Sequence, residues 1–171
     1  MNQHSGSAVI DDERLNFIDT PAHPGVAALA AYWEKKRGGQ AMPDRQSINP
    51  AEIVRLLPNI FICEVVEGGR EFRFRIFGTA LASIFRLEMT GKTLSDIGED
   101  TNIITNVDGA RRRWLSIANA TFQKAAPVFA QGHLVNTVHR SLEWHSYAAP
   151  LTKGGNGIAQ IFGGLFFIDN R

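Results

Sequence analysis

Charged and apolar residues alternate strictly from Glu71 to Ile76, within the segment Glu71–Phe77. A repeat of two residues is the period of a β-strand with one buried face, and we therefore predict a strand here. The apolar run Ile60–Val66 is predicted as its partner, because Glu67, Gly68 and Gly69 supply a hairpin turn between the two. The strand pattern breaks at Gly78, and short helices and loops are predicted over residues 79–106.

A helical period governs residues 24–37. Apolar residues fall there at spacings of three, four and seven, namely Val26, Leu29, Ala30 and Trp33. Pro24 suits the first turn, basic residues in the last turn complement the helix dipole, and Gly38 ends the pattern. The segment is therefore predicted as an amphipathic helix, whose apolar face either covers a sheet or pairs with a second copy of the chain.

Two further helices are predicted. Asn49 can cap a short one, with Pro50 in its first position and Glu52 where a capping box places an acid. A longer one is predicted from about residue 108 to 124, capped by Asn106 or Asp108. Its apolar face carries Leu115, Ala118 and Phe122, with Trp114 beside them.

Three strands are predicted in the last third of the chain, over about residues 128–138, 142–151 and 157–168. The glycine-rich segment between the last two is interpreted as a hairpin turn. Five strands, split two and three by a helical middle, indicate an α+β fold with a five-stranded antiparallel sheet and helices on one face. Residues 1–13 are polar and irregular and are predicted to form a flexible terminus.

The composition is that of one globular domain, with 44% hydrophobic residues in a chain of 171. The formal net charge of +1 gives no electrostatic argument for nucleic acid, and no apolar run is long enough to span a bilayer. The one cysteine, Cys63, cannot form an internal disulfide, and the N-terminus carries no secretory signal. We therefore expect a cytoplasmic protein that neither binds nucleic acid nor inserts into a membrane.

The strand, break and short helices over residues 71–97 include the segment Gly91-Lys92-Thr93-Leu94. Together with the element order over residues 59–168, they resemble the PAS sensory-domain family, in which such short helices and a "GxxL" segment wall a ligand cavity. Motifs nearer the N-terminus are similar to those of stand-alone bacterial, alphaproteobacterial-type PAS proteins with a helical N-terminal extension. They are Tyr32-Trp33, Arg37-Gly38-Gly39, Pro43-Asp44-Arg45, Asn49-Pro50 and Leu57-Pro58. The resemblance implies a helical extension over residues 14–58 and a PAS domain over residues 59–171.

The chain departs from that bacterial pattern at two positions. Asn49 stands where the pattern has aspartate, which keeps the capping chemistry. Arg86, which follows Phe85, stands where the pattern has glycine. That exchange removes an easy left-handed turn and adds a charge near the mouth of the expected cavity.

In a PAS fold the core and the cavity wall are largely the same residues. The resemblance therefore implies a wall formed by Phe61, Phe74, Ile76, Leu81, Phe85, Leu94, Phe122, His133, Trp144, Tyr147 and Ile161. Polar candidates to orient a ligand are Arg73, Arg75, Arg86, His133 and Gln160. Alternation with Phe72 and Phe74 turns Arg73 and Arg75 toward solvent or a partner.

The residues do not indicate a site for a metal ion, haem or a flavin adduct. His133, His139 and His145 lie six residues apart without a fourth ligand at a metal-site spacing, and they are interpreted as strand histidines. The long predicted helix has no histidine to hold haem, and Cys63 lies on a strand, away from the flavin-adduct position of light-sensing relatives. The three arginines at residues 111–113 are interpreted as a solvated helix face. The cofactor is therefore unknown.

The predicted function is a non-catalytic sensory module that binds a small molecule, a protein partner or both. Because no output segment follows the last strand, it is expected to signal in trans, and to form a homodimer through the helix at residues 24–37. A ligand-free interaction adaptor with a filled core is an alternative that the residues do not separate from it. A small α+β enzyme with Asp96 or Glu143 as a buried general base is less well supported, since neither acid has recognisable catalytic partners.

Overall fold

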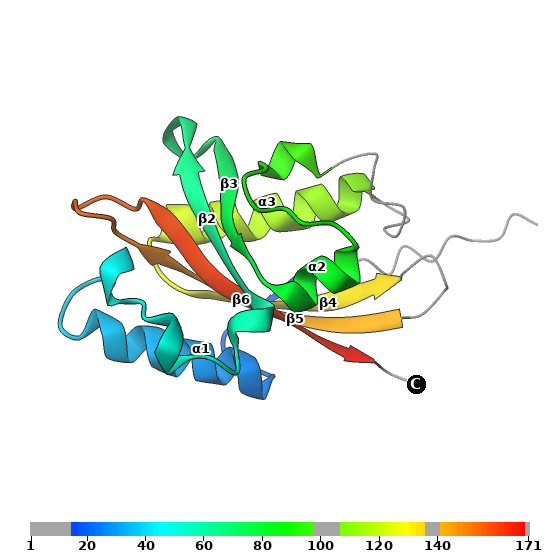
Figure 1. The fold of residues 1–171 in the computed structure, drawn as a ribbon, viewed down its shortest axis with the longest axis horizontal. Helices are drawn as coiled ribbons and strands as arrows, with labels where there is room; N and C mark the ends of the chain where they lie inside the picture. The colour runs from blue at the N-terminus through cyan, green and yellow to red at the C-terminus, as the bar shows by residue number, and fades with distance from the viewer. Residues whose placement is uncertain (1–14, 98–106, 136–140, 170–171) are drawn as a thin grey trace, which may run out of the picture.

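The computed structural model describes residues 15–97, 107–135 and 141–169, and its centre is one antiparallel sheet (Figure 1). The sheet has six strands in the order β1-β4-β5-β6-β2-β3, and every neighbouring pair is antiparallel. The strands are β1 (Leu15–Ile18), β2 (Ile60–Val66), β3 (Glu71–Phe77), β4 (Val128–Val135), β5 (Ser141–Leu151) and β6 (Gln160–Asp169). The predicted hairpin of β2 and β3 is confirmed.

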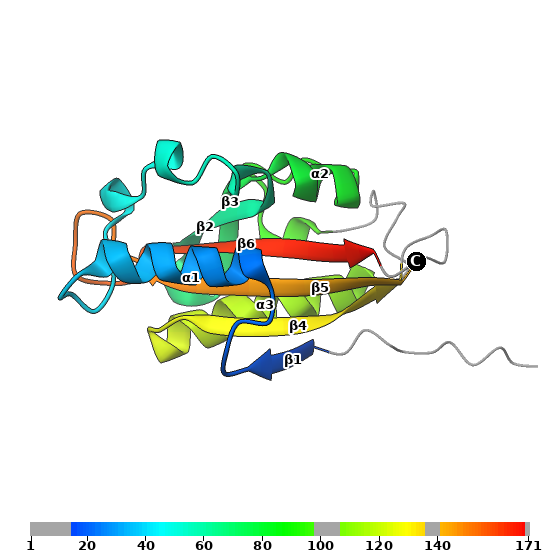
Figure 2. The same ribbon diagram turned by 90° about the horizontal axis from the view of Figure 1, so that it is seen from below.

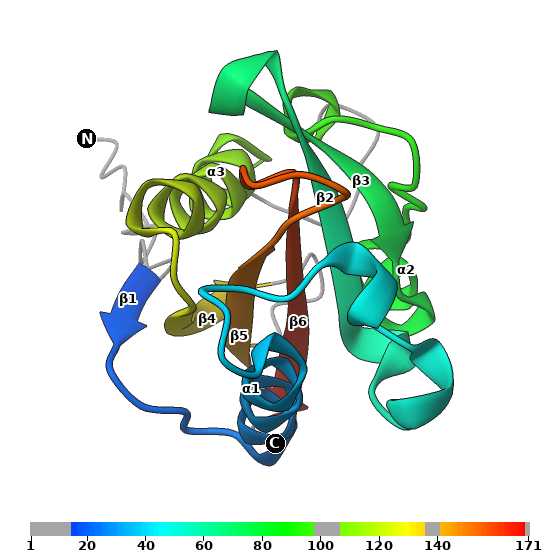
Figure 3. The same cartoon turned by 90° about the vertical axis from the view of Figure 1, so that its left-hand side faces the viewer.

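Helices cover both faces of this sheet. They are α1 (Pro24–Arg37), α2 (Thr79–Phe85) and α3 (Val107–Lys124). Figure 3 shows α3 and α1 on opposite sides of β4, β5 and β6, and Figure 2 shows α1 lying along β5 and β6. The sheet is therefore a middle layer with a hydrophobic core on each side.

Helix α1 has the bounds that the sequence predicts. The His23 side chain caps it, with Nδ1 accepting a hydrogen bond from the Gly25 N–H at 3.0 Å. Val26, Leu29 and Trp33 are buried against the sheet, and the Trp33 indole N–H donates to the Pro150 carbonyl at 3.0 Å. Of the two uses foreseen for its apolar face, the chain adopts the first, since this face covers the sheet.

The segment after Asn49 is shorter than predicted. It forms one 3-10 turn, Pro50–Glu52, and the Asn49 side chain caps it by accepting from the Ala51 N–H at 3.1 Å. Glu52 does not complete a capping box. Its carboxylate accepts from the Tyr32 hydroxyl at 2.8 Å and pairs with Lys36 at 2.6 Å, which ties the turn to α1.

Two features of the fold differ from the prediction. The sheet has a sixth strand, β1, which pairs with β4 and lies in a segment that was assigned to a helical extension. Helices cover two faces and not one, because α1 occupies the face opposite α3. The predicted flexible terminus over residues 1–13, the cap Asn106, and His139 lie outside the described residues.

Strand β5 separates the two cores residue by residue. Trp144, Ala148 and the neighbouring β6 residue Leu165 belong to the core under α3. Tyr147 and Ala149 belong to the core under α1. Both sides of the strand are thus buried, and the candidate site lies on the α3 side.

Candidate ligand cavity beneath α3

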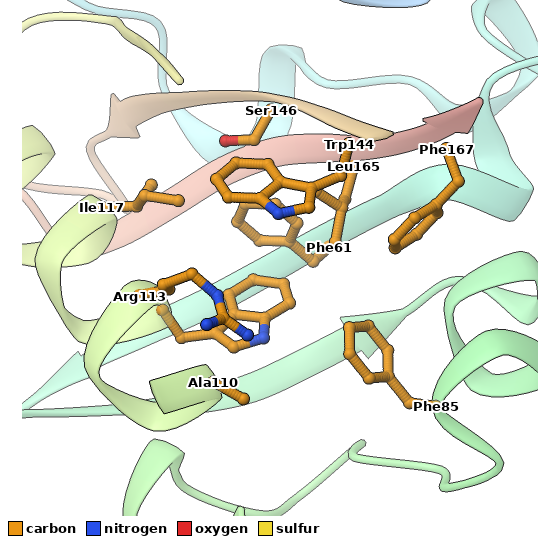
Figure 4. A pocket seen from close by; sticks show the side chains of 10 residues that line it. Phe61, Phe85, Ala110, Arg113, Ile117, Trp144, Ser146, Leu165 and Phe167 are labelled. Carbon is orange, nitrogen blue, oxygen red and sulfur yellow. The ribbon is translucent and has the colours of Figure 1, made fainter. Parts of the chain in front are cut away.

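A cavity lies between α3 and the sheet (Figure 4). Residues of β2, α2, α3, β5 and β6 line it, namely Phe61, Phe85, Ala110, Arg113, Trp114, Ile117, Trp144, Ser146, Leu165 and Phe167. Figure 4 shows Ala110, Arg113 and Ile117 on the helix side and Trp144, Ser146 and Leu165 on the sheet side. The three-layer fold therefore assembles the site from segments that are far apart in the sequence.

The cavity is small in this structure. Its volume is about 40 Å³. An engineered cavity that binds one benzene molecule has about 150 Å³, nearly four times as much. A ligand with one aromatic ring would therefore require side chains of the wall to move apart.

Aromatic side chains form most of its wall. The Phe61 and Trp114 rings meet edge to face with centroids 5.0 Å apart, and the Phe85 and Phe167 rings do so at 6.2 Å. Trp144 is 4% exposed and contributes the sheet side of the wall. Such a wall favours a flat, apolar ligand, because edge-to-face and offset ring contacts add to the burial of apolar surface.

Ser146 is the buried hydroxyl of this wall. It is 2% exposed, and its Oγ has no hydrogen-bond partner among the residues that the structure describes. Its neighbours across the sheet are Ala130 and Leu165, whose side chains cannot accept or donate a hydrogen bond. A buried hydroxyl left without a partner costs about 1–3 kcal/mol, so this atom is suited to bond a molecule in the cavity.

Arginines at the start of α3 lie in three different environments. Arg111 is half-buried and donates to the Ile97 carbonyl at 3.0 Å, Arg112 is exposed, and half-buried Arg113 lines the cavity. Successive helix residues point about 100° apart, which separates the three side chains. The interpretation as one solvated face is therefore wrong for Arg111 and Arg113.

A second, smaller cavity adjoins the first. Its volume by the same measure is about 10 Å³, and its lining residues are Phe74, Phe77, Phe85, Leu87, Met89, Ile97 and Trp114. Phe85 and Trp114 line both cavities. These two side chains therefore form the wall between them.

The structure distributes the predicted wall residues over four places. Phe61, Phe85 and Trp144 line the larger cavity, and Phe74 lines the smaller one. Four others pack in the same core without lining either cavity, namely Leu81, Leu94, Phe122 and Ile161. Ile76 and Tyr147 pack in the core under α1, and His133 pairs across the sheet with Glu143 on that same face.

Sequence reasoning missed the contribution of α3. Ala110, Arg113, Trp114 and Ile117 recur at spacings of three and four, and such a helical stripe could have been recognised once the helix was known to cover the cavity. Ser146 was also missed. A serine two residues after Trp144 and two before Ala148, on the same face of a predicted strand, was the signal available for it.

The face under α1 carries a pair of histidines. His145 is 3% exposed, and its Nε2 lies 2.7 Å from a Glu143 carboxylate oxygen. The ring of His23 stacks on those of His145 and Phe166, with centroids 5.6 and 4.9 Å away. Within residues 15–97, 107–135 and 141–169, no group of three or more His, Cys, Asp or Glu side chains is arranged to hold a metal ion.

The two acids considered as general bases, Asp96 and Glu143, are not buried. Asp96 is exposed, and its carboxylate accepts hydrogen bonds from the Thr93 N–H at 2.9 Å and the Thr93 hydroxyl at 3.1 Å. These bonds lower the pKa of Asp96. Glu143 has 31% of its side chain exposed. The expectation of a buried acid is therefore wrong for both residues.

Cys63 and Arg86 behave as their sequence context predicts. Cys63 lies on β2, is 2% exposed, and burial raises the pKa of its thiol. Arg86 ends α2 in the left-handed conformation, with φ 47° and ψ 34°. That is the backbone conformation for which glycine is suited, as the bacterial pattern has at this position.

An antiparallel sheet between helical layers, with an aromatic-lined cavity under its longest helix, defines the class of α+β domains with a PAS-like fold. A family model described as "PAS domain" matches residues 22–166. The chain belongs to the PAS domain family, whose members generally serve as sensory and signalling modules.

Comparison with other proteins adds fold neighbours only. None of the curated proteins matches the chain. One similar solved structure is the PAS domain from Bordetella pertussis BvgS, with 20% identity, a TM-score of 0.49, and coverage of 71% of this chain and 88% of that chain. Another is an RNA-binding Light-Oxygen-Voltage receptor, with 10% identity, a TM-score of 0.45, and coverage of 91% of this chain and 38% of that chain. Across the described ranges, no helix has the length and apolar character needed to cross a membrane.

Proposed function

We propose that the chain is a non-catalytic sensory module whose cavity beneath α3 binds a small, mostly apolar molecule that carries a hydrogen-bonding group. The observation that carries this proposal is the buried Ser146 hydroxyl, which faces an aromatic cavity and has no hydrogen-bond partner among the described residues. A core that served packing alone would gain stability by replacing this hydroxyl with a methyl group. A cavity that receives a ligand uses the same hydroxyl to orient it.

The second part of the proposal is signalling in trans to a protein partner. Strand β5 presents Ser146 to the cavity, and presents its neighbours His145 and Tyr147 to the layer of α1. A ligand that displaces β5 therefore disturbs the contacts of α1, whose solvent-facing side is available to a partner.

Homodimerisation through α1 remains a prediction, and it would use that same solvent-facing side. A dilution series followed by light scattering tests it, and a monomer at every concentration would contradict it.

Binding to the cavity can be tested with toluene and phenol as probes. Each consists of a single small ring, and Trp114 and Trp144 in the cavity wall make tryptophan fluorescence a direct readout. We expect saturable binding to the native protein. Native mass spectrometry of the purified protein adds an independent test, because a molecule retained from the cell appears as mass that is lost on denaturation.

Two variants of α3 form a matched pair for this test. Ala110→Leu adds three carbons to the cavity wall, and Ala118→Leu adds them to the same helix and core at a residue that lines neither cavity. Both cost stability by overpacking, typically about 1–3 kcal/mol. Only Ala110→Leu should abolish probe binding. Equal binding by folded Ala110→Leu and the wild type, or no binding by the wild type, would favour the ligand-free adaptor.

A further inference from the structure

The N-terminus of α1 is held by one imidazole ring that makes two kinds of contact. Nδ1 of His23 accepts the hydrogen bond from the Gly25 N–H at 3.0 Å, so this ring caps the helix. The same ring stacks on Phe166 of β6 with centroids 4.9 Å apart, and on His145 of β5 at 5.6 Å. The cap therefore also fixes the start of α1 to the two strands along which the helix lies (Figure 2).

This cap requires a neutral ring. An imidazole nitrogen accepts a hydrogen bond only through its lone pair, and in the protonated form both ring nitrogens are donors. Protonation of His23 at Nδ1 would therefore place its new N–H against the N–H of Gly25. It would also place a positive charge at a helix N-terminus, where the helix dipole opposes it. Both effects destabilise the capped state once the ring is charged.

Within the described residues, the titratable groups that face this ring lie on the sheet. They are His145 and Glu143 on β5, with His133 on β4 across from Glu143. Strand β6 presents an uncharged phenyl ring, the first turn of α1 has no acid, and Asp19 in the preceding segment is exposed. Burial and then the His145 ring lower the pKa of His23 from 6.5, and the Glu143 carboxylate offsets them only in part. The neutral ring is thus favoured while the cap is in place.

Release of the cap would also hydrate a buried nitrogen atom. His145 is 3% exposed, and its Nδ1 has no hydrogen-bond partner among the described residues. The His23 ring stacks over the His145 ring, so its departure would open that ring to water. A buried polar atom that gains a water partner recovers its desolvation cost. Charging of His23 and hydration of His145 therefore favour the same released state.

We propose that His23 is an acid-sensitive latch, which fixes the first turn of α1 to the sheet at neutral pH and releases it on acidification. Because the capped ring has the lower pKa, protons bind preferentially to the released state. The docked state is therefore fully stabilised above pH 6.5 and loses this stabilisation as the pH falls through the lowered value. The inference goes beyond the proposed function, since it needs no ligand in the cavity beneath α3.

NMR of the purified protein measures both parts of this proposal. The imidazole signals of His23 give its pKa in the folded state, which should lie below 6.5. Exchange of the Ala27 N–H with water reports release of the first turn, because this N–H donates to the His23 carbonyl at 3.0 Å. Its protection factor, which corrects for the pH dependence of exchange itself, should fall on acidification by about tenfold for each unit by which the pKa is lowered. Amides of α3 should remain more strongly protected than Ala27 at every pH.

His23→Asn and His133→Asn form a matched pair. Asparagine is a good helix cap that does not titrate, so His23→Asn should keep the protection of Ala27 at neutral pH and remove most of its fall on acidification. His133→Asn removes a histidine from the same face of the sheet that does not cap the helix, and it should keep the fall seen in the wild type. The wild-type titration remains decisive if His23→Asn does not fold.

Four outcomes would overturn the latch. They are a His23 pKa at or above 6.5, an equal fall of protection in His23→Asn and the wild type, loss of the fall in His133→Asn, and equal protection of Ala27 and α3. The last result would mean that the first turn opens only when the whole domain unfolds. Each of them leaves ligand binding by the cavity standing, and a failure of toluene and phenol to bind leaves the latch standing, so the two proposals fail separately.

Discussion

Replacement of Ser146 by alanine isolates the contribution of one oxygen atom. The substitution keeps Cβ and removes only Oγ, which is buried in the cavity wall without a partner among the described groups. Because no described protein group loses a hydrogen bond, the free protein should not be destabilised. Relief of an unmet hydroxyl is worth about 1–3 kcal/mol, and we expect the free energy of unfolding to rise by about 1 kcal/mol.

The same substitution should weaken the binding of a hydroxyl-bearing ligand. A net hydrogen bond contributes about 0.5–1.5 kcal/mol, and about 1.4 kcal/mol corresponds to a tenfold change, so phenol should bind about two- to tenfold more weakly. Toluene has nearly the same shape and no hydroxyl, and its affinity should not change. A gain in stability together with a selective loss of phenol is a signature that a change of packing would not produce.

Urea unfolding and titrations followed by tryptophan fluorescence measure the two effects. Thr121→Val is the contrasting control, because Thr121 is a fully buried hydroxyl whose Oγ1 donates to the Ile117 carbonyl at 2.8 Å. It should lower the free energy of unfolding by about 0.5–1.5 kcal/mol and leave phenol binding intact. The reasoning is refuted if Ser146→Ala destabilises the free protein, or if toluene loses as much affinity as phenol.

Three further predictions follow from backbone and electrostatic features. Arg86→Gly should raise the free energy of unfolding by about 0.5–1 kcal/mol, because glycine accepts φ 47° without strain; urea unfolding should show no such gain for Arg86→Ala. Gly163→Ala should cost about 2 kcal/mol or more in the same assay, since its Cβ would lie 2.1 Å from the Tyr147 carbonyl oxygen. Burial, and secondarily the His145 ring, lower the pKa of His23 from 6.5, so its stabilising effect is present above pH 6.5 and is lost as pH falls through the lowered value. His23→Asn keeps a capping side chain that does not titrate, and an unchanged dependence of unfolding on pH in this variant would contradict the assignment.

The sequence predicted those helices and strands whose own residues carry a clear pattern. The bounds of α1 follow from a proline in its first turn, a 3.6-residue period and a glycine after its end. Strand β3 follows from its alternation. Strand β1 has only four residues and is defined by pairing with β4, more than a hundred residues away in the chain, so its own sequence carries too little signal.

The candidate site was predictable only in part, because the sequence does not show which face of the sheet each strand side chain points to. Phe72, Phe74 and Ile76 have the same parity, yet Ile76 packs under α1 while the other two pack under α3. The register between β2 and β3 shifts at Ile62 and Cys63, and such an irregularity turns the following side chains to the other face without any sign in the alternation.

In strand β5 the facing of the side chains cannot be read from the sequence for a different reason. It is buried from Trp144 to Pro150 with no polar face, so the sequence does not show that Ser146 faces the cavity and Tyr147 the other core.

The alternation within β5 also means that the cavity and helix α1 share a wall one peptide unit thick. Successive Cα atoms are about 3.8 Å apart, so an adjustment made at Ser146 reaches the stacked rings of His145 and His23 through a single covalent link. The coupling needs no chain of contacts through the interior, and it is as stiff as the backbone itself. Mutations that change the cavity or the packing of α1 are therefore constrained by each other. Any change that moves β5 to suit the cavity also repositions the cap of α1.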